Sequence, residues 1–314
     1  MDALASLLEQ VRSRGALFGR NVVAPPWSVR FAEDSPLTLL TMLRGSGWIV
    51  PDDADPVPIG ETDVAVVVGT RPFTVAHDRD ASAPPLYVLL PGNRCTAADG
   101  SALTGDLRLG VRTCGARLDG PTVVLTGTYP VRGYASARLV RALPRVLVVP
   151  RTGRLRPALE LTVAEVEREE PGQQAVLDRL LDLLLLSALR EWFARPEVEP
   201  PGWYRALGDP VVGRALRLLH EEPARPWTVA ALAREAGVSR ATLARRFTDL
   251  VGEPPMAYLT GWRLCLAADL LAGTDATVEA VARRVGYESG FGLSVAFKRV
   301  YGTRPTAFRT PVPA

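Results

Sequence analysis

Side chains that could read DNA bases gather on a predicted helix that begins at Ser239, in the C-terminal third of the chain. Arg245 could donate hydrogen bonds to guanine or to a phosphate, and Thr242 could make a hydrogen bond or a methyl contact. Ala241 and Ala244 are small enough for a partner to approach closely. A helix in the major groove reads bases with residues near its N-terminus. The pattern therefore predicts a base-reading helix.

The residues around this helix supply the other elements of a helix-turn-helix. Thr228 is expected to cap a short preceding helix, and Gly237 suits the positive φ of a tight turn. Val238 is expected to fill the core between the two helices. Leu243 and Phe247 are four residues apart, so they form the inner face of the second helix.

The whole pattern occurs twice, and internal repeats are read before other features. The second copy has a threonine, a glycine, a serine, a leucine and a phenylalanine in the same order, at Thr277, Gly286, Ser289, Leu293 and Phe297. The offset is 49 residues up to the glycine and 50 after it. A predicted helix from Pro255 to Ala272 joins the copies, and its roughly 17 residues span about 25 Å. That length could hold two reading helices near the ~34 Å separation of successive major-groove segments.

The second copy differs from the first on its outward face. Gly290 and Gly292 each cost about 1 kcal/mol of helix propensity. Val295 aligns with the arginine reader of the first copy. We expect the second unit to act mostly through Lys298, Arg299 and backbone groups on phosphates, because phosphate contacts position a protein and base contacts specify sequence. The alternative for Lys298 and Arg299 is a solvated helix face.

The predicted DNA-contacting residues fall into two sets. In the first copy they are Ser239, Arg240, Ala241, Thr242, Ala244, Arg245 and Arg246, the last as a phosphate contact or a surface charge. In the second copy they are Ser289, Gly290, Phe291, Ser294, Val295, Lys298 and Arg299. Residues 205–314 carry 15 basic and 10 acidic side chains, in a chain whose net charge is +3. A basic excess in one domain is the expected footprint of nucleic-acid binding, although a mixed-charge solvated surface also fits.

The N-terminal part of the chain is predicted to be mostly β. Residues 3–18 are expected to begin with a short amphipathic helix. Short apolar runs separated by Gly, Pro and Asp clusters then predict an antiparallel sandwich or barrel. These runs are residues 27–31, 37–43, 48–50, 64–68, 86–90, 107–112, 123–128 and 146–149, with a brief helix near residues 136–143.

Two further helices are predicted, over Thr162–Glu169 and Gln173–Ala194. The second has an apolar stripe broad enough to be buried on the barrel, on a second chain, or on both. The proline-rich segment Arg195–Gly202 is the candidate linker. We therefore predict an α+β multidomain chain with domains at residues 1–196 and 207–314, joined by a linker at 197–206.

Two stretches carry a family resemblance: Ala233–Phe247 in the first copy, and Val281–Ser289 with Ala296–Gly302 in the second. On these motifs, residues 207–310 resemble the DNA-binding domain of the AraC/XylS family of transcriptional regulators. The resemblance implies a C-terminal all-α domain of seven helices, with two helix-turn-helix units joined by a linker helix. It also implies a separate sensing or dimerising domain. Val295 departs from the family, whose members usually carry a polar or basic DNA-facing residue there.

Residues 1 to about 195 resemble, more loosely, the cupin-type N-terminal domain of one AraC subgroup. The stretches that carry this are residues 15–18, 24–27, 44–48, 110–113, 119–129 and 139–144. The resemblance implies a cupin-like antiparallel β-barrel with flanking helices. Cupin enzymes hold a metal with about three histidines and a carboxylate, but this chain has only His77 and His220, one in each half. We therefore expect no metal, no cofactor and no enzymatic activity.

The barrel is expected to bind a small organic effector or to serve as a dimerisation scaffold. The candidate lining residues are Trp27, Trp48, Phe73 and Tyr87, although aromatic residues in a small barrel are more often plain core. An alternative is a thiol-redox switch through Cys95 and Cys114. Against that stands the simpler interpretation that both cysteines are small, partly buried apolar residues.

These observations predict a transcription regulator, activator or repressor, that binds an asymmetric double-stranded DNA operator. The other expected partners are a second copy of the chain and, for an activator, RNA polymerase. The alternatives are a cupin-fold enzyme with a DNA-binding tail and an architectural DNA-binding protein with a vestigial barrel. The most apolar run, Leu180–Leu189, is too short for a membrane span of about 20 apolar residues. No secretory signal is visible, so a cytoplasmic protein without membrane partners is expected.

Overall fold

A computed structural model gives the structure of the chain. It describes residues 3–8, 18–32, 34–90, 94–101, 113–115, 119–129, 133–151, 154–166, 168 and 170–308. Contacts divide the chain into two compact units. The β unit comprises residues 11–131 and 143–198, and the helical unit comprises residues 1–10, 132–142 and 199–314. None of the described helices is long and apolar enough to cross a membrane.

The β unit consists of two six-stranded sheets. The first has the order β10 (Thr113–Gly115), β1 (Phe18–Val23), β11 (Thr122–Tyr129), β3 (Leu37–Arg44), β6 (Val64–Val68) and β12 (Val146–Val149). The second has the order β5 (Val57–Ile59), β4 (Gly47–Pro51), β7 (Phe73–Ala76), β2 (Ser28–Phe31), β8 (Val88–Leu90) and β9 (Arg94–Thr96). One apolar cluster contains residues from both sheets, including Phe31, Leu40, Ile49 and Val75. The predicted β architecture is confirmed, except that the pairs β1–β10 and β2–β8 are parallel.

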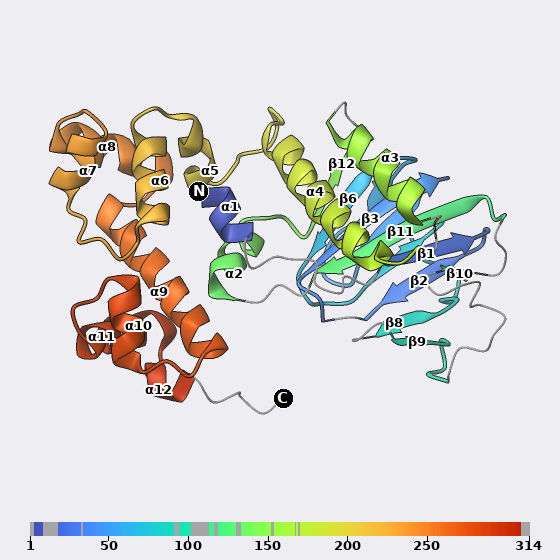
Figure 1. Cartoon of the computed structure of the whole chain (residues 1–314). Helices are drawn as coiled ribbons and strands as arrows, with labels where there is room; N and C mark the ends of the chain where they lie inside the picture. Colours follow the sequence, from blue (N-terminus) through green and yellow to red (C-terminus); the bar gives the residue numbers. More distant parts are fainter. Residues whose placement is uncertain are drawn as a thin grey trace. The chain divides into compact units, whose positions relative to one another are not determined.

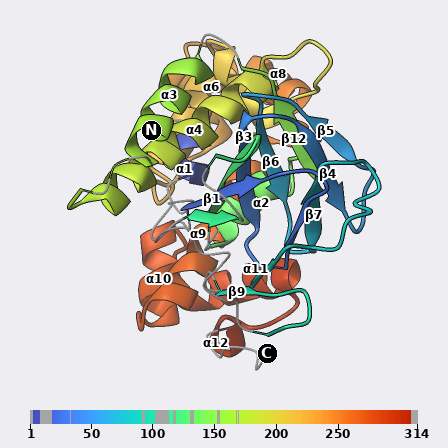
Figure 2. The ribbon, with the colours of Figure 1, turned by 90° about the vertical axis from the view of Figure 1, so that its right-hand side faces the viewer.

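The outer face of the first sheet is covered by two helices, α3 (Leu155–Val166) and α4 (Gln173–Phe193), which lie side by side (Figures 1 and 2). The Tyr129 hydroxyl of β11 donates to the Leu181 carbonyl of α4 at 2.7 Å. A side chain at Gly127 would collide with Leu181, so the glycine allows the helix to approach the strand closely. Strands β6 and β11 are buried at every position and β3 at its first six, so consecutive residues on both faces are apolar or small threonines and glycine.

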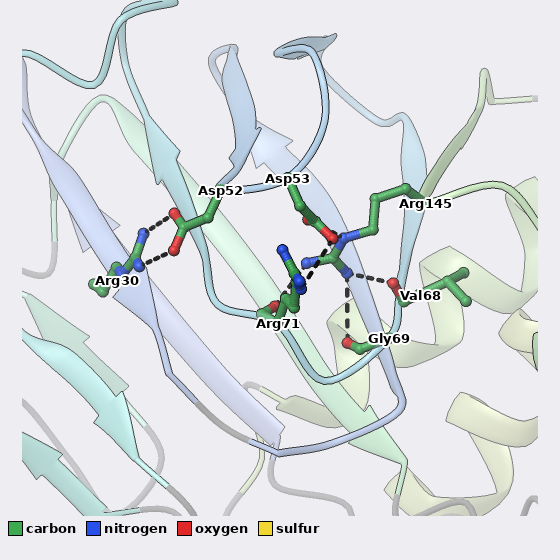
Figure 3. A network of polar contacts seen from close by, with 7 residues as sticks. All are labelled: Arg30, Asp52, Asp53, Val68, Gly69, Arg71 and Arg145. Atoms are coloured by element: carbon green, nitrogen blue, oxygen red, sulfur yellow. Dashed lines mark hydrogen bonds and ion pairs between the residues drawn. The ribbon is translucent and has the colours of Figure 1, made fainter.

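An arginine network ties the end of this sheet to neighbouring turns (Figure 3). Arg145, just before β12, donates to Asp53 at 2.8 Å and to the Arg71 carbonyl at 2.6 Å. It also donates to the Val68 carbonyl. The hydrogen bond from Arg145 holds the pKa of Asp53 below its usual range. Arg30 forms a similar pair with Asp52.

The helices predicted in the N-terminal half are present, and one of them begins earlier than expected. The short helix predicted at the start of residues 3–18 is α1 (Ala3–Leu8), and β1 begins at Phe18. The helix predicted at Thr162–Glu169 is α3, which begins at Leu155 because Leu155 and Leu159 bury one face. The brief helix near residues 136–143 is α2 (Tyr134–Val140). The predicted strand at residues 107–112 lies outside the described residues.

The helical unit contains seven successive helices that match the expected pattern of two helix-turn-helix units. They are α6 (Val212–Glu221), α7 (Val229–Glu235), α8 (Arg240–Val251), α9 (Pro255–Gly273), α10 (Val278–Val285), α11 (Gly290–Tyr301) and α12 (Pro305–Phe308). The short α5 (Gly202–Arg205) lies in the predicted linker, and a 3₁₀ turn (Ala206–Gly208) begins at its last residue. Figure 1 shows α9 running from the group α6–α8 to the group α10–α12. The predicted linker helix is thus confirmed, with one residue added at its C-terminus.

Two helices from the first half of the sequence pack within this helical unit. The backbone N–H of Ala135, in the first turn of α2, donates to the Asp269 carboxylate of α9 at 3.3 Å, and that of Tyr134 binds the same carboxylate. Arg138 pairs with Glu253 at 2.8 Å. The hydroxyl of Ser136 donates to α1, which lies beside α2. The predicted N-terminal domain contained α1 and α2, so the contacts differ from that division of the chain.

Candidate DNA-binding interface

The two copies of the repeat fold with the same caps. The hydroxyls of Thr228 and Thr277 accept hydrogen bonds from the third residue beyond them, each at 3.1 Å, and so begin α7 and α10. Ser239 accepts from the backbone N–H of Thr242 at 3.1 Å, and Ser289 accepts from that of Gly292 at 3.2 Å. These bonds satisfy amide groups that a helix start would otherwise leave unpaired. The helix starts predicted at Thr228 and Ser239 are confirmed, and the second copy repeats them at Thr277 and Ser289.

The turns between the paired helices depend on a glycine with positive φ. Gly237 has φ of 70° and Gly286 has φ of 90°. A Cβ at Gly237 would meet no described atom within 4 Å, whereas a Cβ at Gly286 would lie 2.7 Å from the Cα of Ala224. The turn of the second copy therefore packs against the loop that precedes the first copy. Arg263 of α9 strengthens this junction by donating to the Pro223 carbonyl at 2.7 Å.

The inward faces of α8 and α11 hold the core of each copy. Leu243, Phe247, Leu293 and Phe297 are fully buried. Phe247 lies edge-on to Tyr258 of α9, with ring centroids 5.8 Å apart. Because the inward faces are fixed in this way, the residues between these positions must face outward. That is the arrangement predicted for a base-reading helix.

The structure places the predicted contact residues of α8 near its exposed N-terminal half. Arg240, Ala241 and Arg245 are exposed, and Thr242 and Ala244 are half-buried. The hydroxyls of Ser239 and Thr242 lie 2.8 Å apart and share a hydrogen bond. Thr242 therefore serves the cap as well as the outward face. Arg245 makes no ion pair among the described residues, which leaves its guanidinium available for a partner.

Arg246 was expected to be a phosphate contact or a surface charge, and it has a third role. Its guanidinium donates to the Asp209 carboxylate at 2.6 and 2.9 Å. The other oxygen of Asp209 accepts from the backbone N–H groups of Val211 and Val212, each at 2.9 Å, at the start of α6. Burial of Asp209 opposes ionisation, but these bonds and Arg246 outweigh it, so the pKa of Asp209 lies below its usual range. Sequence reasoning missed this pair because its members are 37 residues apart.

The start of α11 explains one of its two glycines. The backbone N–H of Gly290 donates to Glu279 of α10 at 2.6 Å. A Cβ at Gly290 would lie 2.9 Å from that carboxylate, so the glycine allows the two helices to pack closely. Its low helix propensity is thus offset by a contact between the helices of the second unit. The hydroxyl of Ser294 turns back to the Gly290 carbonyl at 2.7 Å.

The outward face of α11 combines apolar and basic residues. Phe291 is 80% exposed and Val295 is 57% exposed. Lys298 and Arg299, about one turn further along, are also exposed. Neither basic side chain makes an ion pair with a described residue, so both remain available to phosphates.

In the β unit, three of the four candidate lining residues lie together. Trp27, Phe73 and Tyr87 are buried in the cluster between the sheets, whereas Trp48 is half-buried on β4 and lies outside that cluster. The indole N–H of Trp27 is buried without an acceptor among the described residues. Tyr87 donates its hydroxyl hydrogen to Asn21. Its pKa is raised well above the usual value, mainly by burial.

The two cysteines of the proposed redox switch lie on edge strands of different sheets, β9 and β10. Cys95 and Cys114 are half-buried thiols that pack against the same cluster. That cluster contains Tyr87, whose pKa both thiols help to raise. The third cysteine, Cys265, is buried in α9 of the helical unit, as expected for a core residue.

The comparisons with known proteins agree with this two-part arrangement. A family model described as "Cupin" matches residues 2–194, and one described as "Helix-turn-helix domain" matches residues 232–310. A Streptomyces antibioticus protein described as an AraC-like transcription regulator is 34% identical over 319 residues, which span 100% of both chains. The chain belongs to the family of AraC-like transcription regulators. The first-half resemblance to a cupin and the second-half resemblance to the AraC DNA-binding domain are both confirmed.

This AraC-like regulator has further relatives that span its length or its DNA-binding part. A second AraC-like regulator, from Streptomyces lividans, is 32% identical over 314 residues and covers 98% of each chain. The crystal structure of the DNA-binding domain of AdpA in complex with a target DNA aligns with 32% of this chain and 91% of that chain. It is 35% identical, with a TM-score of 0.31. The regulator is thus a DNA-binding transcription regulator with an N-terminal cupin domain.

Proposed function

We propose that the regulator binds an asymmetric operator through two adjacent major-groove segments, and that its first unit reads bases by hydrogen bonds. The observation that carries this proposal is the difference between the outward faces of two equivalent helices. Arg245 is exposed on α8, whereas the equivalent residue on α11 is Val295. An arginine can donate two hydrogen bonds to guanine, which a valine cannot do. Lys298 and Arg299 would hold the second segment through phosphates.

A base-pair substitution scan tests this proposal. The full chain would first select a duplex from a random pool, and each base pair of that duplex would then be changed in turn. We expect guanine substitutions in one segment to cost about 1–3 kcal/mol each. An equal cost from guanine substitutions in both segments would contradict the unequal roles of the two units.

We further propose that the protein is not an enzyme and that it acts in the cytoplasm.

We propose that the cupin domain senses a small organic effector. The indole N–H of Trp27 has no acceptor among the described residues and lies inside the cluster with Phe73 and Tyr87, which supports an effector site. A buried donor without an acceptor is costly, so a ligand oxygen there would be stabilised. Binding should shift Trp27 fluorescence, and a Trp27→Phe variant should lose that shift. If the protein activates transcription, RNA polymerase is the expected further partner.

We propose a redox switch as a second candidate, because Cys95 and Cys114 are half-buried and pack against the same apolar cluster. Oxidation by diamide or hypochlorite is expected to change gel mobility and operator affinity of the unmodified protein. A Cys95→Ser variant should be insensitive to the same treatment. Unchanged mobility and affinity of the unmodified protein after oxidation would rule out this candidate.

We propose that the regulator dimerises through α4. Val176 and Leu183 are 45% and 44% exposed, and they are seven residues apart, on one face of the helix. Exposed apolar side chains gathered on one face mark interaction surfaces. Leu183→Asp should therefore shift the protein from dimer to monomer in sedimentation, with an unchanged circular dichroism spectrum because the side chain is exposed and outside the core. A dimer that persists in this variant would argue against α4 as the interface.

A further inference from the structure

The N-terminal two turns of α11 present an apolar surface where a base-reading helix usually presents polar groups. Phe291 and Val295 are four residues apart and lie on the side of α11 opposite to Leu293 and Phe297. Their exposed fractions are 80% and 57%, while those of Leu293 and Phe297 are 0%. These two side chains are therefore not part of the core of the second unit.

Gly292 and Ser294, the residues of α11 between Phe291 and Val295 that are not in the core, add no free hydroxyl or charge to this surface. Gly292 has no side chain, and the Ser294 hydroxyl donates to the Gly290 carbonyl of its own helix at 2.7 Å. The hydroxyl of Ser289 is the helix cap. Lys298 and Arg299 lie further along the helix, beyond Val295. The surface around Phe291 and Val295 is thus mainly hydrocarbon.

Only one feature of a base pair in the major groove matches a hydrocarbon surface. Guanine, cytosine and adenine present hydrogen-bond donors and acceptors there, whereas thymine adds a C5 methyl group. We propose that α11 recognises thymine methyl groups through Phe291 and Val295. This inference rests on the proposed placement of α11 in a major-groove segment. Contact with the methyl groups would remove the exposed apolar surface of the Phe291 side chain from water.

The repeat provides a comparison within the same chain. The residues equivalent to Phe291 and Val295, 50 positions earlier, are Ala241 and Arg245. The first unit therefore has a small residue and a hydrogen-bond donor where the second has a large aromatic and a branched apolar side chain. The two units would read different chemical features of DNA, hydrogen-bonding groups in one segment and methyl groups in the other. The second unit then selects thymine as well as holding phosphates.

Replacing thymine by deoxyuridine tests this inference, because it removes the methyl group and leaves the base-pairing groups unchanged. The probe is the duplex selected by the full chain, with deoxyuridine at the thymines of the second segment only. For the unmodified protein, the Kd is expected to rise about fourfold for each methyl group that is contacted. Phe291→Ala and Val295→Ala should bind the thymine duplex more weakly and show a smaller difference between the two duplexes.

Val300→Ala is the matched control. Val300 is 55% exposed on the same helix, but nine residues from Phe291 it faces roughly the opposite direction. It should keep the full preference for thymine. All three side chains are exposed, so none of the substitutions removes core packing.

The outcomes separate this inference from the proposed function. A footprint of the unmodified protein with only one protected segment would contradict both the proposed function and the methyl inference. A protected second segment with equal affinity for the two duplexes would overturn only the methyl inference. A Phe291→Ala variant that keeps the full deoxyuridine effect, or that dissociates a dimer instead, would also overturn it and make the apolar surface a protein contact.

Discussion

Replacing Arg245 with alanine is expected to reduce discrimination for the operator by about 1–3 kcal/mol. Arg245 is exposed on α8, six residues beyond the cap at Ser239, and it makes no ion pair with a described residue. Its guanidinium can donate to two acceptors of one guanine. The loss should appear as relaxed preference at one or two base pairs, measured by competition between the selected duplex and its single-base variants. Arg245→Lys should restore little of it, since lysine cannot reproduce the planar bidentate geometry.

Arg299→Ala is the control for this prediction, because it removes the same charge from the equivalent region of the second copy. Arg299 is exposed and aligned with Asp249 rather than with Arg245. Its loss should weaken binding to all sequences alike and reduce the salt dependence by about one phosphate contact. If Arg245→Ala behaved like Arg299→Ala, the first unit would not be the hydrogen-bonding reader.

Substituting the two turn glycines by alanine should have very different costs. Gly237→Ala places a side chain in the left-handed region but meets no described atom, so we expect a loss of about 1–2 kcal/mol. Gly286→Ala adds a clash with the backbone of Ala224, with the new Cβ only 2.7 Å from its Cα. The total cost is expected to reach about 2–5 kcal/mol, because overpacking adds to the backbone strain.

Amide hydrogen exchange measures this difference where it arises. In Gly286→Ala, exchange should accelerate in α10 and α11 and at the loop around Ala224. In Gly237→Ala, the smaller acceleration should be confined to α7 and α8. Equal acceleration of exchange in the two variants would mean that the contact between Gly286 and Ala224 does not hold the two helix-turn-helix units together.

The duplicated pattern allowed most of the DNA-binding unit to be predicted from the sequence. Caps such as Ser239, turn glycines such as Gly286 and inward residues such as Phe297 are set by local chemistry, and each lies where its spacing requires. The outward residues follow from the same spacing. Phe291 was placed among the outward residues by this spacing, and it is 80% exposed, although an apolar residue in a helix is usually buried.

Contacts between distant segments were harder to predict. The docking of α2 on α9 joins residues that are 135 positions apart, and no local pattern encodes such a pair. Asp269 was the available signal, as the single acidic residue on α9. The strands β5, β9 and β10 were missed because three residues are too few to show alternation, and the longer β1 and β7 were missed as well.

Hydroxyl-radical footprinting combined with guanine methylation interference tests the central claim most directly. On the duplex selected by the full chain, we expect two protected segments on one face, about one helical turn or ~34 Å apart. Methylation of guanine N7 should interfere strongly in one segment only, and Arg245→Ala should abolish that interference. A single protected segment, or strong guanine interference in both segments, would contradict a regulator whose two units read DNA in different ways.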